Sequence, residues 1–460
     1  MENNLHFIGI GGIGMSAIAR IMLGQGFDIS GSDLQESRLT RTLAGQGARI
    51  SYGHAPQNLP ADARAVVYSS AVEEDNLEMK EARRRGLTVY KRAEMLAYLI
   101  GCKRGIGVAG SHGKTTVSGM IATMLELTGQ NPTIIIGGML PLIGSNAKAG
   151  AGPCLVAEAD ESDGTFLLLK PEIAVVTNIE SDHLDYYRDL RHLKQTFAQY
   201  LRQLPQNGFA VVCADCPQVR EVMDSVPGRY ITYGLQTPAR YTAAAISHCN
   251  TGVSADVYDN GTLLGRFSLS VPGEHNVANA LAALAVGREL GLGFDEIAQA
   301  LSRFSGTGRR FEIMGEKDGV TVVDDYAHHP TELAATIGAA GAMYKKRRIV
   351  AVFQPHRYSR TQVMYAGFAQ ALTEVGAVVI QEIYPAFEQP IPGVSARLIV
   401  EEAQRLGYGD IYYAEEEDQT LAMLARLTRP GDLLLIMGAG NIRTVAERFL
   451  APALDKEEKR

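Results

Sequence analysis

Short apolar runs alternate along the chain with longer segments of mixed polarity. The runs lie at 5–10, 106–109, 155–158, 173–177, 209–213, 320–324, 348–353, 377–380 and 433–437. Several of the intervening segments have the length and periodicity of helices, among them 15–23, 116–127, 276–290 and 294–304. Strands that alternate with helices of this length are typical of βαβ units, so we predict an α/β protein with mostly parallel sheets. Polar alternation between Val253 and Val271 predicts a small antiparallel ribbon within it.

Two polar, glycine-containing segments, 101–105 and 305–308, divide this pattern into three stretches. We therefore predict a Rossmann-like domain at 1–104, a central mononucleotide-binding domain of the P-loop type at 105–308, and a second Rossmann-like domain at 309–460. A chain of 460 residues agrees with about three domains.

Composition and charge exclude several classes of protein. Hydrophobic residues make up 46% of the chain and the net charge is −7, which argues against a disordered chain and against a nucleic-acid-binding protein. No apolar run is long enough to span a bilayer, so we expect no membrane insertion. Five scattered cysteines and the absence of a convincing signal peptide predict a cytoplasmic protein. We expect a monomer or a weak homodimer.

The first apolar run leads into a glycine loop with the pattern GxGxxG, formed by Gly9, Gly11 and Gly14. Glycines at such a turn let backbone N–H groups approach a diphosphate at a helix N-terminus, which makes Gly11, Gly12 and Gly14 candidate ligand contacts. Asp33 lies 19 residues after Gly14, where a carboxylate can bind a ribose hydroxyl. NAD and a nucleoside-diphosphate sugar both fit this pattern, and a tight turn that binds nothing is the simpler alternative.

A second glycine loop follows the strand predicted at 106–109. Its residues are Gly110, Ser111, His112, Gly113, Lys114, Thr115 and Thr116. Lys114 would contact the β- and γ-phosphates of a nucleoside triphosphate, and Thr115 would offer its hydroxyl to Mg²⁺. The match to a P-loop is incomplete, because Val108 occupies the position of its first glycine.

Candidate metal ligands follow two further strands of the central stretch. Glu158 ends the run at 155–158 and begins an acidic segment that continues to Asp163. Magnesium favours a hydroxyl, one or two carboxylates and phosphate oxygens, so Glu158 is a candidate ligand together with Thr115. His183 follows the run at 173–177 and is a candidate ligand of a second metal. A solvated acidic turn and a structural histidine are the alternatives.

Two nucleotide sites in one chain suggest an ATP-driven reaction of a nucleotide-linked substrate. An NAD-dependent dehydrogenase with an added ATP domain is a second hypothesis, and a nucleotide-gated binding protein without chemistry is a third. The acidic segment, His183 and the pair Arg357 and Arg360 favour chemistry.

An ordered series of motifs runs through all three stretches. It comprises IGIGGIGMSAIA, GSHGKTT, EADESD, TNIESDHLDYY, PGEHNVANA, GRRFE, DDYAHHPTE and FQPHRYSR. In this order the chain resembles the Mur ligases, and within that family the ligases that add the first amino acid to a muramic acid. A recycling ligase that attaches a whole peptide to the same sugar nucleotide is the nearest alternative.

The resemblance implies a reaction in which ATP phosphorylates the lactyl carboxylate of UDP-N-acetylmuramate and L-alanine then attacks the acyl phosphate. ATP and Mg²⁺ would be the cofactors, and UDP-N-acetylmuramate and L-alanine the substrates. Lys114 and Mg²⁺ would stabilise the charge on the transferred phosphoryl group.

The resemblance also assigns roles to individual residues. Besides the loop from Gly110 to Thr116, those implied to bind ATP are His275, Asn276, Asn279, Arg309 and Arg310. Thr115 and Glu158 would hold one Mg²⁺, and His183 a second. Those implied to contact the sugar nucleotide, the reacting carboxylate or alanine are Asp33, His54, Ser69, Ser70, Tyr326, His328, Arg357 and Arg360. Lys114, Glu158, His183, His328, Arg357 and Arg360 would form the catalytic set, with His328 a candidate base for the alanine amine.

Two positions depart from the family pattern. Ala198 stands where some Mur ligases carry a carbamylated lysine, and Asn441 stands where an acidic residue is usual.

Overall fold

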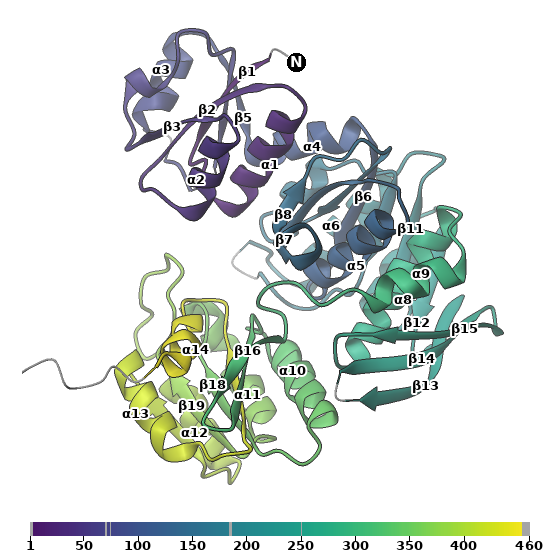
Figure 1. Ribbon diagram of the computed structural model, residues 1–460, viewed down its shortest axis with the longest axis vertical. Helices are drawn as coiled ribbons and strands as arrows, with labels where there is room; N and C mark the ends of the chain where they lie inside the picture. The colour runs from purple at the N-terminus through teal and green to yellow at the C-terminus, as the bar shows by residue number, and fades with distance from the viewer. Residues whose placement is uncertain (1–2, 70, 74, 184–185, 250, 453–460) are drawn as a thin grey trace, which may run out of the picture. The chain divides into compact units, whose positions relative to one another are not determined.

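The computed structural model describes residues 3–69, 71–73, 75–183, 186–249 and 251–452. The described residues divide into two compact units. Figure 1 labels the helices and strands along the chain. The first draws on Met1–Ala245, Ala255–Phe267 and Ala278–Phe304, and the second on Ile246–Ser254, Ser268–Val277 and Ser305–Arg460.

The first sheet has five parallel strands in the order β3-β2-β1-β4-β5. Its strands are β1 (Asn4–Ile8), β2 (Asp28–Asp33), β3 (Arg49–Tyr52), β4 (Ala65–Tyr68) and β5 (Thr88–Lys91). Its helices are α1 (Ile13–Gly24), α2 (Arg38–Gly45), α3 (Leu77–Arg84) and α4 (Arg92–Gly101), with a short 3₁₀ turn η1 (Pro56–Asn58). Strand order reverses between β1 and β4, and ligands of open α/β sheets bind at such a reversal.

The second sheet has ten strands in the order β15-β14-β13-β12-β11-β10-β6-β9-β7-β8. They are β6 (Arg104–Ala109), β7 (Thr133–Leu140), β8 (Ser145–Lys148), β9 (Cys154–Glu158), β10 (Ile173–Val176), β11 (Phe209–Cys213), β12 (Tyr230–Gly234), β13 (Tyr241–Cys249), β14 (Gly252–Asp259) and β15 (Thr262–Leu269). The accompanying helices are α5 (Lys114–Leu127), α6 (Leu190–Arg202), α7 (Pro217–Ser225), α8 (Glu274–Glu289) and α9 (Phe294–Ser302), with 3₁₀ turns η2 (Pro141–Ile143) and η3 (Thr165–Leu168). β6 pairs in parallel with both β9 and β10, so the loops after these three strands meet at one edge.

The polar ribbon predicted between Val253 and Val271 corresponds to β14 and β15, and β13, which precedes the predicted range, is the next strand of the sheet. Asn260 and Gly261 alone connect β14 to β15, and both have positive φ, at 47° and 79°. Two such residues form the tight turn whose twist suits an antiparallel hairpin.

The third sheet has six strands in the order β16-β17-β21-β18-β19-β20, of which only β16 runs antiparallel to its neighbour. Its strands are β16 (Glu312–Lys317), β17 (Val320–Asp325), β18 (Ile349–Phe353), β19 (Ala377–Gln381), β20 (Ile411–Ala414) and β21 (Leu433–Met437). Its helices are α10 (Pro330–Met343), α11 (Tyr358–Leu372), α12 (Arg397–Arg405), α13 (Glu417–Leu427) and α14 (Arg443–Leu450). Val323 and Leu435 pack in one apolar cluster and Val322 and Leu434 in another, because successive side chains face opposite sides of a sheet whose two faces are both covered.

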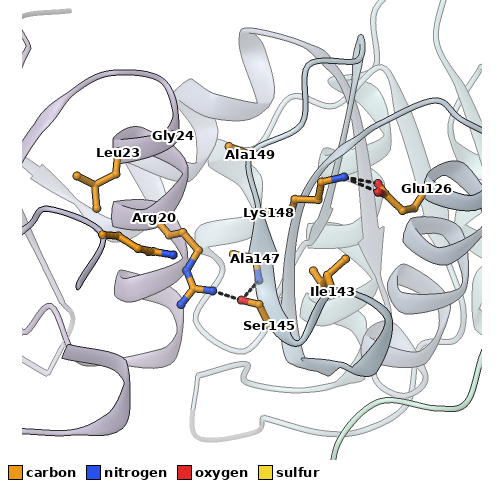
Figure 2. A pocket seen from close by; sticks show the side chains of 10 residues that line it. Arg20, Leu23, Gly24, Glu126, Ile143, Ser145, Ala147, Lys148 and Ala149 are labelled. Carbon is orange, nitrogen blue, oxygen red and sulfur yellow. Dashed lines mark hydrogen bonds and ion pairs between the residues drawn. The ribbon is translucent and has the colours of Figure 1, made fainter. Parts of the chain in front are cut away.

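The first two sheets belong to one unit, and α1 connects them. Arg20 on α1 donates a hydrogen bond to Ser145 on β8, as Figure 2 shows. A Cβ atom on Gly24 would lie 2.7 Å from that of Ala149, so the helix approaches the strand closely because Gly24 has no side chain. A cavity of about 570 Å³ lies beside this contact, with Arg20, Ser145 and Lys148 among its lining residues.

Three sheets with interleaved helices confirm the predicted three-part α/β fold. The boundaries predicted at 1–104, 105–308 and 309–460 stay predictions. No helix in the described ranges has both the length and the apolar character needed to cross a bilayer.

Candidate functional site

The first glycine loop connects β1 to α1 at the strand reversal of the first sheet. Gly9 has a φ of 76°, and a Cβ there would lie 3.2 Å from Cβ of Ser69, which follows β4. Gly11 donates its N–H to Oδ2 of Asp33, which ends β2, over 2.7 Å. The fold thus brings Gly11, Asp33 and Ser69 together as candidate ligand contacts, whereas Ser70 lies outside the described residues.

His54 follows β3 at the same edge of the sheet. Its Nδ1 lies 3.1 Å from Oγ of Ser32 and 3.3 Å from Oε1 of Glu78. The Glu78 side chain is fully buried. Sequence reasoning missed Glu78, because an acidic residue in the first turn of a helix is usually read as a response to the helix dipole.

The second glycine loop connects β6 to α5 and needs its glycines for two reasons. Gly110 and Gly113 have φ values of 133° and 83°, which residues with side chains rarely adopt. A Cβ on Gly110 would also lie 2.1 Å from Oγ1 of Thr177, and one on Gly113 would lie 2.9 Å from Oδ1 of Asn279. The predicted ATP contact Asn279 therefore lies directly against the loop.

Residues after β10 hold the backbone of this loop in place. Thr177 donates its hydroxyl to the carbonyl oxygen of His112 over 2.6 Å, and Asn178 accepts the N–H of His112 over 2.8 Å. Nε2 of His112 lies 3.5 Å from a carboxylate oxygen of Glu180. The loop conformation is thus set by the neighbouring strand as well as by its own glycines.

Lys114 begins α5 and points back into the loop. Its Nζ donates to the carbonyl oxygen of Gly110 over 2.6 Å and to Oε1 of Glu161 over 2.9 Å. Burial acts to lower the pKa of Lys114, but the charges of Glu161 and Asp160 outweigh it, so the net shift is upward and the ammonium group stays charged. An ammonium group held at the carbonyl oxygens of such a loop is well placed to bind the oxygens of a phosphate group.

Thr115 and Glu158 are hydrogen-bonded to each other, so their two side-chain oxygens lie close together beside the loop. The Thr115 hydroxyl donates to Oε2 of Glu158 over 3.2 Å, and the N–H of Gly137 donates to Oε1 over 2.6 Å. Burial raises the pKa of Glu158 despite the opposing charge of Lys114. A hydroxyl and a carboxylate, both oxygen donors beside the second glycine loop, fit the ligand preference of Mg²⁺.

His183 follows β10 with a φ of 54°. Its Nε2 lies 3.6 Å from Oδ2 of Asp182 and 3.7 Å from Oε1 of Glu161, so Glu161 lies between His183 and Lys114. Sequence reasoning named the acidic segment but gave Glu161 no role, because its burial depends on packing rather than on position at a strand end. A second metal at His183 stays a prediction.

The other two predicted ATP contacts on α8 have different surroundings. Asn276 is buried and donates its amide to the carbonyl oxygen of Pro272 over 2.7 Å, whereas His275 is exposed. The hydrogen bond from Asn276 to Pro272 stabilises the first turn of α8. Binding of ATP by Asn276 or His275 stays a prediction.

In the second unit, two arginines flank Tyr326, which follows β17. The guanidinium carbons of Arg309 and Arg310 lie 4.9 and 5.3 Å from the centre of its ring, a distance typical of cation–π contacts. Arg309 also donates to the carbonyl oxygen of Gly438 over 2.7 Å, and Arg310 lies 3.5 Å from Oε1 of Glu332. Both arginines thus contact other residues of the second unit, and contact of either with ATP stays a prediction.

His328 and the two predicted arginines of the alanine site lie in the same unit. Nδ1 of His328 is 3.2 Å from Oε2 of Glu332, and its ring centre is 6.0 Å from that of His356. His356 in turn is 3.4 Å from Nη1 of Arg360. Arg357 precedes α11 with a φ of 72°, and Arg360 lies in the first turn of that helix. Sequence reasoning missed Glu332 and His356, whose role depends on contacts between loops.

Family models match almost the whole chain. The "Mur ligase family, catalytic domain" model matches residues 4–104, "Mur ligase middle domain" matches 108–287, and "Mur ligase, glutamate ligase domain" matches 309–440.

Individual relatives extend over nearly the same length. The UDP-N-acetylmuramate–L-alanine ligase of Geobacter sp. (strain M21) is 48% identical over 97% of this chain and 96% of its own length. That of Syntrophotalea carbinolica is 49% identical over 96% of each chain. The crystal structure of the UDP-N-acetylmuramate–alanine ligase of Thermotoga maritima is similar with a TM-score of 0.82, at 30% identity over 97% of this chain and 98% of that one.

Proposed function

The chain belongs to the Mur ligase family, and from this we propose that it is an ATP-dependent ligase that joins L-alanine to the lactyl carboxylate of UDP-N-acetylmuramate. The observation that carries the proposal is the phosphate loop, where Lys114 and the pair Thr115 and Glu158 lie together at one sheet edge. Full-length similarity to ligases named for this reaction supports the choice of substrates. The reaction would take place in the cytoplasm, where ATP and sugar nucleotides are available.

A carboxylate cannot form an amide readily, because its oxygen is a poor leaving group. In the proposed reaction a lactyl carboxylate oxygen attacks the γ-phosphorus of ATP, and the bond to ADP breaks. The alanine amine then attacks the carbonyl carbon, loses a proton, and expels inorganic phosphate. Lys114 would hold the phosphoryl oxygens as their charge changes. Thr115 and Glu158 would hold Mg²⁺, which neutralises charge on the phosphates when it is bound.

The second unit would supply the residues that bind the amino acid. We propose that Arg357 and Arg360 bind the alanine carboxylate through charge-assisted hydrogen bonds, with His356 orienting Arg360. His328 would accept the proton from the alanine amine, and Glu332, 3.2 Å from Nδ1, would orient its ring. Tyr326 would contact the sugar nucleotide, and Arg309 or Arg310 the ATP. His183 would hold a second metal, with Asn279, Asn276 and His275 contributing to the ATP site.

Release of ADP tests the function directly. The full chain is incubated with ATP, Mg²⁺ and UDP-N-acetylmuramate, and ADP is followed in the presence of each of a panel of amino acids and of the peptide L-alanyl-γ-D-glutamyl-meso-diaminopimelate. We expect turnover with L-alanine that stops when the sugar nucleotide is left out. Turnover with the peptide alone would instead indicate a recycling ligase, and turnover without any amine would indicate an ATPase. Sedimentation of the same preparation tests the expected monomer or weak homodimer.

A further inference from the structure

Helix α3, beside the first sheet, carries a buried carboxylate that has no role in the proposed reaction. Glu78 lies in the first turn of α3 with its side chain fully buried. Its Oε2 accepts hydrogen bonds from the hydroxyl of Ser32 over 2.7 Å and from Nε2 of His6 over 2.8 Å. Its Oε1 accepts from Nδ2 of Asn58 over 2.9 Å and from the N–H of Ala55 over 3.1 Å.

These donors explain why a charged group can be buried here. Burial acts to raise the pKa of Glu78, but the hydrogen bonds from His6, Ser32 and Asn58 lower it to about 2. Within the described residues no lysine or arginine lies within ion-pair distance of Glu78, so histidines and neutral donors stabilise the charge. Buried carboxylates are tolerated when their lone pairs are satisfied in this way.

The network also determines which nitrogen of His54 carries a proton. The Ser32 hydroxyl hydrogen is directed to Glu78, so Oγ of Ser32 is left as an acceptor. Nδ1 of His54 lies 3.1 Å from that oxygen and 3.3 Å from Oε1 of Glu78, two acceptors that both require Nδ1 to donate. The tautomer with its proton at Nδ1 presents a lone pair at Nε2, for which no protein partner is present in the described part of the chain. The tautomer follows from the hydrogen-bond pattern.

The same carboxylate holds together the loops that surround the first glycine loop. Ser32 accepts the N–H groups of Gly9 and Ile10 at its carbonyl oxygen, over 2.9 and 3.0 Å. Gly53 donates to the carbonyl oxygen of Asp33 over 2.8 Å, and Asn58 donates to the carbonyl oxygen of Gly53 over 2.9 Å. Glu78 thus contacts the end of β2 and the segment after β3, and through Ser32 it is connected to the glycine loop.

We propose that Glu78 is a positioning residue for the sugar nucleotide, because it fixes the tautomer of His54 and the conformation of residues 53–58. This inference rests on the proposed function, since it assigns the first glycine loop to that substrate. His54 then offers Nε2 as an acceptor for an N–H or O–H donor of the nucleotide. A glutamine at position 78 would place an NH₂ group, which donates, where one carboxylate oxygen of Glu78 now accepts hydrogen bonds. The hydrogen bonds to that oxygen would then be lost.

The variant Glu78→Gln tests the proposal, and Glu81→Gln is its matched control. Glu81 lies on the same helix but bonds only to Arg84 in contacts at the surface. For Glu78→Gln we expect the KM for UDP-N-acetylmuramate to rise about tenfold, with kcat and the KM for ATP within about twofold of wild type. The control should match the wild type in all three values. Equal losses for both substrates, or no change in either KM, would overturn the proposal.

A second measurement does not depend on catalysis. Nitrogen-15 NMR of histidine-labelled full chain should show His54 protonated at Nδ1 in the wild type, and a mixture of tautomers in Glu78→Gln. Protonation at Nε2 in the wild type would overturn the proposal. If the tautomer shifts as expected but no ligase activity is found, the proposed function fails, and with it the role toward the sugar nucleotide, while the effect of Glu78 on the His54 tautomer stands. If Glu78→Gln does not fold, Ser32→Ala is measured in its place. We expect this variant to raise the KM for UDP-N-acetylmuramate, and an unchanged KM would contradict the proposal.

Discussion

The two glycine loops, at 9–14 and 110–116, have the same placement but different surroundings. Each follows a parallel strand and leads into a helix. The first is bound by the Asp33 carboxylate and has no lysine, whereas the second contains Lys114 and faces Glu158 and Glu161. The difference suggests that the backbone arrangement provides phosphate binding in both, and that only the second loop carries the charged groups needed to transfer a phosphoryl group.

Removal of the Lys114 ammonium should have the largest effect and should separate the two loops. For Lys114→Ala we expect kcat for ADP release to fall about 10³-fold or more, because the cation stabilises charge on the transferred group. Binding of UDP-N-acetylmuramate, measured by calorimetry, should stay within about twofold, since that ligand uses the other loop. Lys170→Ala, at an exposed position in the same unit, is the control. A similar loss of sugar-nucleotide binding would contradict the division of roles.

The variant Glu158→Gln should cause the next largest loss of activity. The amide keeps an acceptor for the Gly137 N–H but removes the charge that would hold Mg²⁺ beside Thr115. We expect activity at fixed Mg²⁺ to fall about 10- to 100-fold and to recover partly as Mg²⁺ is increased. Titration of the rate with Mg²⁺ measures this, with Glu126→Gln, at the other end of α5, as control. An unchanged Mg²⁺ requirement would show that Glu158 is not a ligand.

Asp33→Ala tests the first loop by itself. The carboxylate is the acceptor for Gly11, so its loss should loosen the loop and raise the KM for UDP-N-acetylmuramate about tenfold while kcat stays within about twofold. Asp28→Ala changes an exposed carboxylate at the opposite end of the same strand and should have little effect. A large fall in kcat for Asp33→Ala would mean that this loop also takes part in the chemical step.

The smallest expected effect concerns stability and pH. Burial raises the pKa of Glu158 in the folded chain above its ordinary value of 4.5. At a pH between 4.5 and this raised pKa, Glu158 keeps its proton in the folded chain and loses it in the unfolded chain. The contribution of Glu158 to the stability of the ligand-free protein should therefore fall as pH rises through this window. Glu158→Gln removes the buried charge, and we expect its Tm to exceed that of wild type by about 2 °C near pH 8 and to match it near pH 4. Thermal denaturation without nucleotide or metal measures this, and a lower Tm for the variant near pH 8 would contradict it.

Periodicity and glycine spacing were sufficient to predict the alternation of strands and helices, and the strand at 209–213 was predicted with its observed bounds. They also brought Thr115, Glu158 and Lys114 into one prediction, because strand ends of a parallel sheet share an edge. Glu78, Glu161 and Glu332 were missed for a common reason. Each is buried or nearly buried, and neither composition nor spacing indicates which acidic residue of a polar segment is enclosed.

The central claim is that ATP bound at the second glycine loop phosphorylates the lactyl carboxylate of a sugar nucleotide that is bound at the first glycine loop. Oxygen-18 in the lactyl carboxylate of UDP-N-acetylmuramate follows that step, because the oxygen that attacks phosphorus leaves with the phosphate when alanine attacks carbon. In a single turnover with ATP and L-alanine, mass spectrometry of the released inorganic phosphate should show one atom of oxygen-18. Phosphate that carries no label while the amide forms would contradict the account.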